Sequence, residues 1–115
     1  MDSRKRNQRI ISAALTSLFM FQQTMMLSAF STEITGVIGN NGIYNINPTA
    51  VNGSMGYRKY NDFDLSKGDV ANLNFLKGNK NIETFVNLVN NKINIEGTVN
   101  SMRGNNFYNG KAVFV

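Results

Sequence analysis

Short apolar runs separated by polar breakers make up most of the chain after residue 31. Runs of this length, bounded by Asn, Gly, Asp or Ser, are typical of strands joined by turns. Ala71, Leu73 and Phe75 alternate with polar residues and so share one face, as do Ile93 and Ile95. The pattern therefore predicts a mainly β structure with strands over 42–46, 56–60, 69–75, 92–95 with 98–99, and 112–115.

One segment has a different period. In Asn81–Asn90 the apolar residues Ile82, Phe85, Val86 and Val89 fall at the spacing of one helical stripe. Asn81 is a good N-cap, and the next turn carries a carboxylate that the helix dipole favours. We expect one short helix here, packed on a sheet because it is too short to be stable alone.

The first thirty-one residues have the pattern of a signal peptide. Basic residues at 4, 5, 6 and 9 precede an apolar run, Ile10–Phe21, that is shorter than the roughly 20 residues needed to span a bilayer. Signal peptidase requires small side chains one and three places before the cut, and Ser31 and Ala29 meet that requirement for cleavage after Ser31. An uncleaved signal anchor and a buried amphipathic helix are the alternatives. We expect a helical signal peptide over 1–31 and a mature segment over 32–115.

Asparagine is the commonest residue type of the mature segment. Asn tolerates left-handed backbone at tight corners, and its amide can hydrogen-bond to the next strand in a stack. The dipeptides Asn41-Gly42 and Asn109-Gly110 are turn signals. These features favour a stacked β-solenoid, although a β-sandwich would accept the same strands. The last run, Lys111–Val115, is apolar with no polar exit, so we expect a fragment of a longer protein.

Composition excludes most catalytic chemistry. The chain has no cysteine, histidine or tryptophan, which removes disulfides, thiolate zinc sites, most catalytic triads and the usual transition-metal ligands. The run Asp62–Asp69 resembles the start of a calcium loop, but Lys67 and Leu73 stand where Gly and Glu are required. It is interpreted as a solvated turn. We expect no enzyme activity, no catalytic or metal-binding residues, and no cofactor.

The net charge of +5 does not indicate nucleic-acid binding. Residues 1–31 account for +3 of it and the remaining residues for +2, spread thinly along the chain. In Tyr57–Tyr60 two tyrosines enclose two basic residues, as a platform for single-stranded nucleic acid might. We favour the alternative, a β-strand that buries its aromatics while Arg58 and Lys59 face water or a partner.

Several dispersed stretches resemble the two-partner-secretion domain of filamentous haemagglutinins, and among these the leukotoxin-type filamentous adhesins of fusobacteria. They are Gly42–Pro48, Gly53–Leu65, Gly68–Leu73, Lys92–Ser101 and Gly110–Val115. The resemblance implies the start of a right-handed parallel β-helix with an N-terminal cap. The usual Asn-Pro-Asn-Gly turn after the last strand is missing here.

The resemblance also implies a function. The secretory machinery of the inner membrane would export the chain to the periplasm, where periplasmic recognition domains of an outer-membrane transporter would bind it. The product would be secreted or surface-attached, and any contact with a host would depend on downstream regions. Residues implied at the transporter contact are Tyr57, Arg58, Tyr60, Phe63 and Asn72. A small secreted β-rich binding protein, for example one that binds glycans, and a non-functional gene fragment are the alternatives.

Overall fold

The computed structural model describes residues 31–115, and within them Thr32–Val115 form one unit. All regular elements in this range are strands, and it contains no helix. In chain order the strands are β1 (Glu33–Ile34), β2 (Ile43–Ile46), β3 (Ala50–Asn52), β4 (Met55–Leu65), β5 (Val70–Asn74), β6 (Leu76–Lys77), β7 (Lys80–Asn81), β8 (Thr84–Ile95), β9 (Thr98–Arg103), β10 (Asn106–Phe107) and β11 (Lys111–Phe114). The prediction of a mainly β structure is confirmed.

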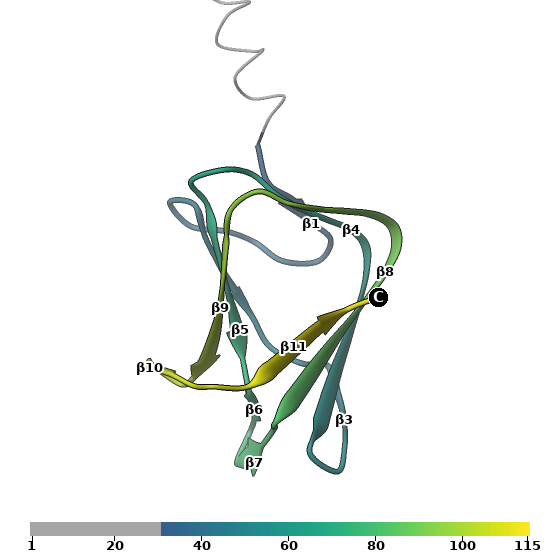
Figure 1. Ribbon diagram of the computed structural model, residues 1–115, viewed down its shortest axis with the longest axis vertical. Helices are drawn as coiled ribbons and strands as arrows, with labels where there is room; N and C mark the ends of the chain where they lie inside the picture. The colour runs from purple at the N-terminus through teal and green to yellow at the C-terminus, as the bar shows by residue number, and fades with distance from the viewer. Residues whose placement is uncertain (1–30) are drawn as a thin grey trace, which may run out of the picture. The chain divides into compact units, whose positions relative to one another are not determined.

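Two mixed sheets contain most of these strands. The first sheet has the order β1-β4-β8-β11, and β3 also pairs with β4. The second has the order β10-β9-β5-β2, and β6 and β7 form a separate hairpin. Their central strands run parallel, whereas β1, β3 and β10 pair antiparallel with them. Figure 1 shows β5 and β9 on one side of the core and β4 and β8 on the other.

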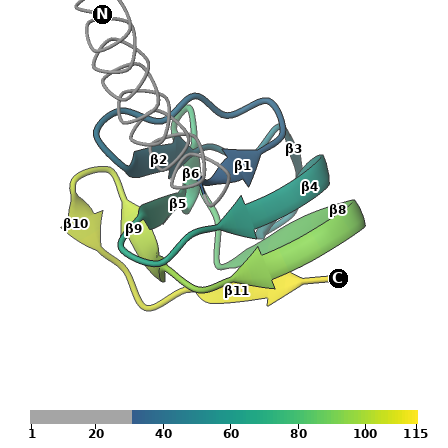
Figure 2. The ribbon, with the colours of Figure 1, turned by 90° about the horizontal axis from the view of Figure 1, so that it is seen from above.

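The parallel strands recur along the chain at a nearly constant interval. In the second sheet, Tyr44 lies beside Ala71, and Ala71 lies beside Val99. In the first sheet, Met55 lies beside Thr84, at almost the same separation in sequence. Figure 2 shows the two sets stacking in the same order, from β2 and β4 to β9 and β11. The chain thus passes from one sheet to the other in each layer before returning.

The predicted helix over 81–90 is wrong, because most of this segment belongs to strand β8. In the strand, Phe85, Asn87 and Val89 alternate toward the core, while Val86 lies on the opposite face. Because Asn87, a polar residue, occupies the core position between Phe85 and Val89, the sequence does not show the apolar alternation of a strand. Val86 instead completes a spacing that resembles one face of a helix. Long parallel pairing with β4 then decides the conformation, since an isolated helix of this length is marginal.

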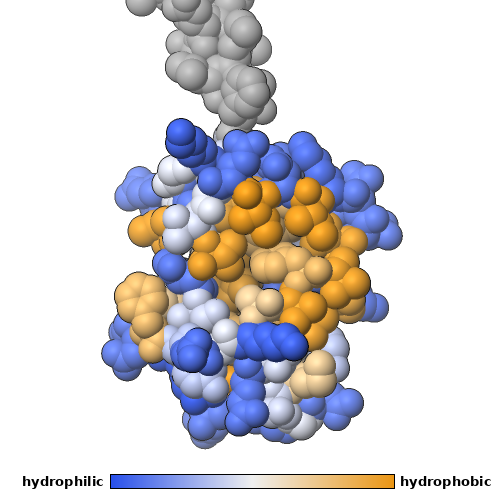
Figure 3. Space-filling model, viewed as in Figure 1, coloured by the Kyte–Doolittle hydropathy of each residue, from blue (hydrophilic) through white to orange (hydrophobic). Residues whose placement is uncertain are grey.

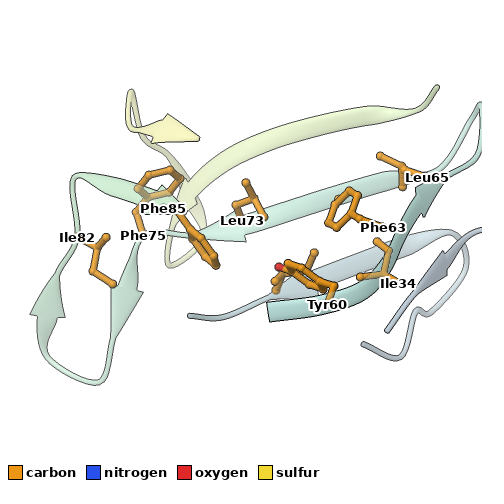
Figure 4. Close-up of a cluster of buried hydrophobic side chains, with 10 residues drawn as sticks. Ile34, Tyr60, Phe63, Leu65, Leu73, Phe75, Ile82 and Phe85 are labelled. Atoms are coloured by element: carbon orange, nitrogen blue, oxygen red, sulfur yellow. The ribbon is translucent and has the colours of Figure 1, made fainter. Parts of the chain in front are cut away.

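A single apolar core lies between the two sheets, and Figure 4 shows its principal side chains. Phe75 and Phe85 meet edge to face, with ring centroids 5.8 Å apart. The largest fully buried apolar side chains are Phe63, Phe75, Phe85, Ile46, Leu65, Leu73 and Ile82. The shared inward face predicted for Ala71, Leu73 and Phe75 is confirmed, since all three are fully buried.

The sheets are mixed in direction and do not close on themselves. The described residues therefore establish a mainly β fold with stacked parallel strands. The signal-peptide prediction, including the cleavage residues Ala29 and Ser31, falls on residues 1–31, of which 1–30 lie outside the described range.

Candidate recognition surface

Strand β4 carries four of the five residues implied at a transporter contact. Alternation along the strand directs Arg58 and Tyr60 inward and Tyr57 outward. A β-bulge after Tyr60 shifts the alternation, so that Phe63 also faces the core. Asn72 lies in β5 of the other sheet, on its outer face. The structure therefore does not gather the five side chains into one patch.

Arg58 ties two preceding loops to β4. Its guanidinium donates hydrogen bonds to the carbonyl oxygens of Asn47, at 3.0 Å, and Gly36, at 3.1 Å. The same group lies 5.8 Å from the centroid of the Tyr60 ring, within cation–π range. Because these loops flank the two short strands that cover one edge of β4, Arg58 holds that end of the stack together.

Tyr60 belongs to a buried polar network. Its hydroxyl donates a 2.7 Å hydrogen bond to Oδ1 of Asn87, and Nδ2 of Asn87 donates to the carbonyl oxygen of Val113 at 3.2 Å. Burial raises the pKa of the Tyr60 hydroxyl well above its ordinary value, and the positive charge of Arg58 opposes part of that rise. The network links β4, β8 and β11 side by side.

Phe63 is fully buried, and its ring packs edge-on against Tyr60 and Phe114, at centroid distances of 5.3 and 4.9 Å. A partner that binds the folded surface would thus reach Tyr57 but not Phe63. The resemblance could not reveal this difference, because side-chain direction after the bulge depends on the register with β8.

The sequence predicted that the acidic run Asp62–Asp69 is a solvated turn, but only part of it is. Asp62 and Asp64 lie in β4, and only 66–69 form the turn before β5. Asp64 accepts hydrogen bonds from Asn94 at 3.0 Å and from Lys92 at 3.1 Å. These two bonds lower the pKa of Asp64, and the bond from Asn94 has the larger effect. Within residues 31–115, no group of three or more acidic residues could hold a metal ion.

The two ends of the stack differ. At the first layer, β1 and β3 pair with β4 and cover parts of its free edge. At the last layer, β11 pairs only with Thr84–Asn87 of β8, so the inward positions Ile93 and Ile95 stay 46% and 40% exposed. Figure 3, viewed from the β11 side, shows apolar surface bordered by polar side chains. This edge is suited to pairing with a further strand.

Rows of asparagine cross the outer face of the second sheet. Nδ2 of Asn100 donates to Oδ1 of Asn72, and Nδ2 of Asn72 donates to Oδ1 of Asn45, both at 3.1 Å. A parallel row joins Asn74 to Asn47 at 3.0 Å. The sequence predicted such amide bonding between stacked strands, and the ladders confirm it. The sequence analysis did not identify which asparagines pair, although Asn45, Asn72 and Asn100 are almost evenly spaced in the sequence and could have indicated it.

No family model matches the chain, and no curated protein or solved structure shows a significant match to it. The described part of the chain, residues 31–115, contains no helix that is long and apolar enough to cross a membrane.

Proposed function

We propose that this chain is the N-terminal secretion and recognition module of a filamentous adhesin, haemagglutinin or leukotoxin-like exoprotein. In this proposal residues 1–31 direct export to the periplasm, where an outer-membrane transporter recognises residues 32–115. The product then reaches the cell surface or the medium. The observation that carries the proposal is the parallel stacking of β2, β5 and β9 beside β4, β8 and β11.

The layered arrangement supports the finer fold assignment, the start of a right-handed parallel β-helix. Two sets of strands recur at a nearly constant interval along the chain, as successive turns of a solenoid would. Parallel connections within one sheet are right-handed in almost all proteins. The antiparallel strands β1 and β3 would serve as the N-terminal cap.

The unequal ends of the stack support a role in recognition or in further assembly. A capped first layer protects one edge from unwanted pairing, whereas the last layer offers main-chain groups and inward apolar positions. Transporter domains would bind such a module by shape and strand pairing, with Tyr57 among the side chains they reach.

Export is tested by expressing the whole chain in a Gram-negative host and determining the N-terminus of the periplasmic product by mass spectrometry. We expect a product that begins at Thr32. Replacing both Ala29 and Ser31 by Leu should block processing, and Ser28→Leu, one position further from the cut, is the matched control. Unprocessed protein confined to the cytosol would contradict the export part of the proposal.

Recognition is tested with the periplasmic domains of the outer-membrane barrel encoded beside this gene, immobilised for surface plasmon resonance. We expect saturable binding that Tyr57→Ala weakens several-fold and that Lys77→Ala, at an exposed hairpin position, leaves unchanged. The absence of such a neighbouring gene, or of binding to its product, would refute the recognition part.

A further inference from the structure

The outer face of the second sheet contains a groove in which five of the seven lining residues are asparagines. Its volume is about 340 Å³, at the lower end of the range for small-molecule sites. Its walls come from β2 and the residue just after it, from β5, from β9 and from the turn after β9. The lining residues are Asn45, Asn47, Asn72, Asn74, Met102 and the turn pair Gly104 and Asn105.

The amides of this groove are held in place by one another. Asn72 accepts from Asn100 and donates to Asn45, while Asn74 donates to Asn47 and accepts from the backbone N–H of Gly104 at 3.1 Å. Each carboxamide has two N–H groups and two acceptor lone pairs, so these bonds use only half of the capacity of Asn72 and Asn74. The remainder is pre-oriented, which lowers the entropy cost of binding a ligand.

Spacing makes the groove a regular array. Amides in one row are one strand apart, about 4.8 Å, and the two rows are two residues apart along the strand, roughly 6.6 Å. Each position offers both a donor and an acceptor. Neighbouring hydroxyl groups, each also a donor and an acceptor, match such an array, and Met102 adds an apolar contact at its edge.

The absence of charged side chains in the groove favours a neutral ligand. None of the residues that line the groove is charged. The one nearby cation in sequence, Arg103, is engaged elsewhere, since it donates to the carbonyl oxygens of Phe75 and Ile82 and lies over the Tyr108 ring. A phosphate, sulfate or carboxylate would therefore find no cationic partner here.

We propose that this groove is a binding site for a neutral oligosaccharide. The proposal is independent of transporter recognition, because it rests on the outer face of the second sheet alone. It assigns to this module a direct contact with glycans that does not depend on any downstream region.

The test is calorimetric titration of the whole chain with maltotriose, cellotriose, mannotriose and chitotriose. We expect at least one of them to bind. In NMR spectra of the complex, the side-chain amide signals of Asn72 and Asn74 should shift. Asn72→Ala and Asn74→Ala should each weaken binding about tenfold or more, equivalent to about 1.4 kcal/mol. Asn79→Ala, at an exposed turn position in the β6–β7 hairpin, is the matched control and should bind like the wild type.

Loss of binding in the ladder variants could also come from a damaged sheet, so Asn105→Ala provides a second measurement. Asn105 lines the groove at the turn and is not a member of either amide row. Its replacement should weaken binding several-fold while the thermal midpoint stays unchanged. No binding of the four trisaccharides, or equal affinity in the Asn105→Ala and Asn79→Ala variants, would overturn the proposal.

Discussion

At the scale of single residues, the buried Asn87 links three neighbouring strands. It has no solvent exposure, and its amide contacts Tyr60 of β4 and Val113 of β11. No buried side-chain polar atom among the described residues lacks a hydrogen-bond partner. A shift of one residue in either pairing would remove one of these two partners, and losing a partner in the core costs more than the bond itself contributes. Asn87 thus selects one register for three parallel strands.

Replacing Asn87 by Ala should lower the free energy of unfolding by about 3 kcal/mol, because it leaves a cavity and removes the partner of the buried Tyr60 hydroxyl. The double variant Tyr60→Phe/Asn87→Leu should recover part of that loss, since it removes both polar groups together. Urea unfolding followed by circular dichroism measures both. A double variant less stable than Asn87→Ala would contradict this account.

Burial of Tyr60 also predicts a pH dependence. The pKa of its hydroxyl is raised in the folded state, so the unfolded chain loses this proton first as the pH rises. The stability associated with Tyr60 is fully present below about pH 10, the ordinary tyrosine pKa, and is lost as the pH rises further. Urea titrations at increasing pH should show a decline that is shallower in Tyr60→Phe. Parallel pH profiles for the two proteins would rule the mechanism out.

At the scale of elements, close contact between successive layers places strict demands on the corners. Gly97 forms the corner between β8 and β9, where its amide donates to the carbonyl oxygen of Leu65 in the layer before it. A Cβ atom at Gly97 would lie 2.4 Å from the carbonyl oxygen of Asp69 and 2.6 Å from that of Ser66. Both obstacles are main chain, so they cannot rotate away as a side chain would.

Gly97→Ala should therefore cost about 2 kcal/mol or more, by forcing the two corners apart. The matched control is Gly78→Asn in the β6–β7 hairpin. Gly78 has a φ of 59°, a conformation that Asn tolerates, and a Cβ there meets no atom within 4 Å. We expect little change in the free energy of unfolding for the control. Equal effects of the two substitutions would show that the layers are not in contact at this corner.

At the scale of the whole molecule, burial decreases from the inner layers to the last one. Leu65 and Ile95 occupy paired positions in neighbouring strands, yet Leu65 is fully buried and Ile95 is 40% exposed. The difference arises because β11 covers only the first part of β8. Leu65 and Ile95 therefore contribute unequally to the stability of the fold, although they occupy the same inward position in successive layers.

Leu65→Ala should cost about 3 kcal/mol of stability and Ile95→Ala only about 1 kcal/mol, since the lost apolar burial and the resulting cavity differ. Chemical denaturation of both variants measures the difference. Adding a further strand over the last layer should raise the cost of Ile95→Ala toward that of Leu65→Ala. Equal costs in the chain as it stands would mean that Ile95 is covered already.

Features that depend on near neighbours in the chain could be predicted from the amino-acid pattern alone. Alternation at Ala71, Leu73 and Phe75 identified a strand with one buried face, and Asn41-Gly42 identified a tight turn, in which both residues have positive φ. The mainly β class and the amide bonding between strands followed from the same local preferences.

Which residues meet across the layers depends instead on pairing between distant parts of the chain. Asn87 lies in the core, where its amide accepts a hydrogen bond from the hydroxyl of Tyr60, far back along the chain. Long parallel pairing with β4 makes the apparent helix around it part of strand β8. Pairing over such distances also buried Phe63 and assembled the amide groove. Local patterns do not encode these outcomes, because each depends on a register set jointly by several strands.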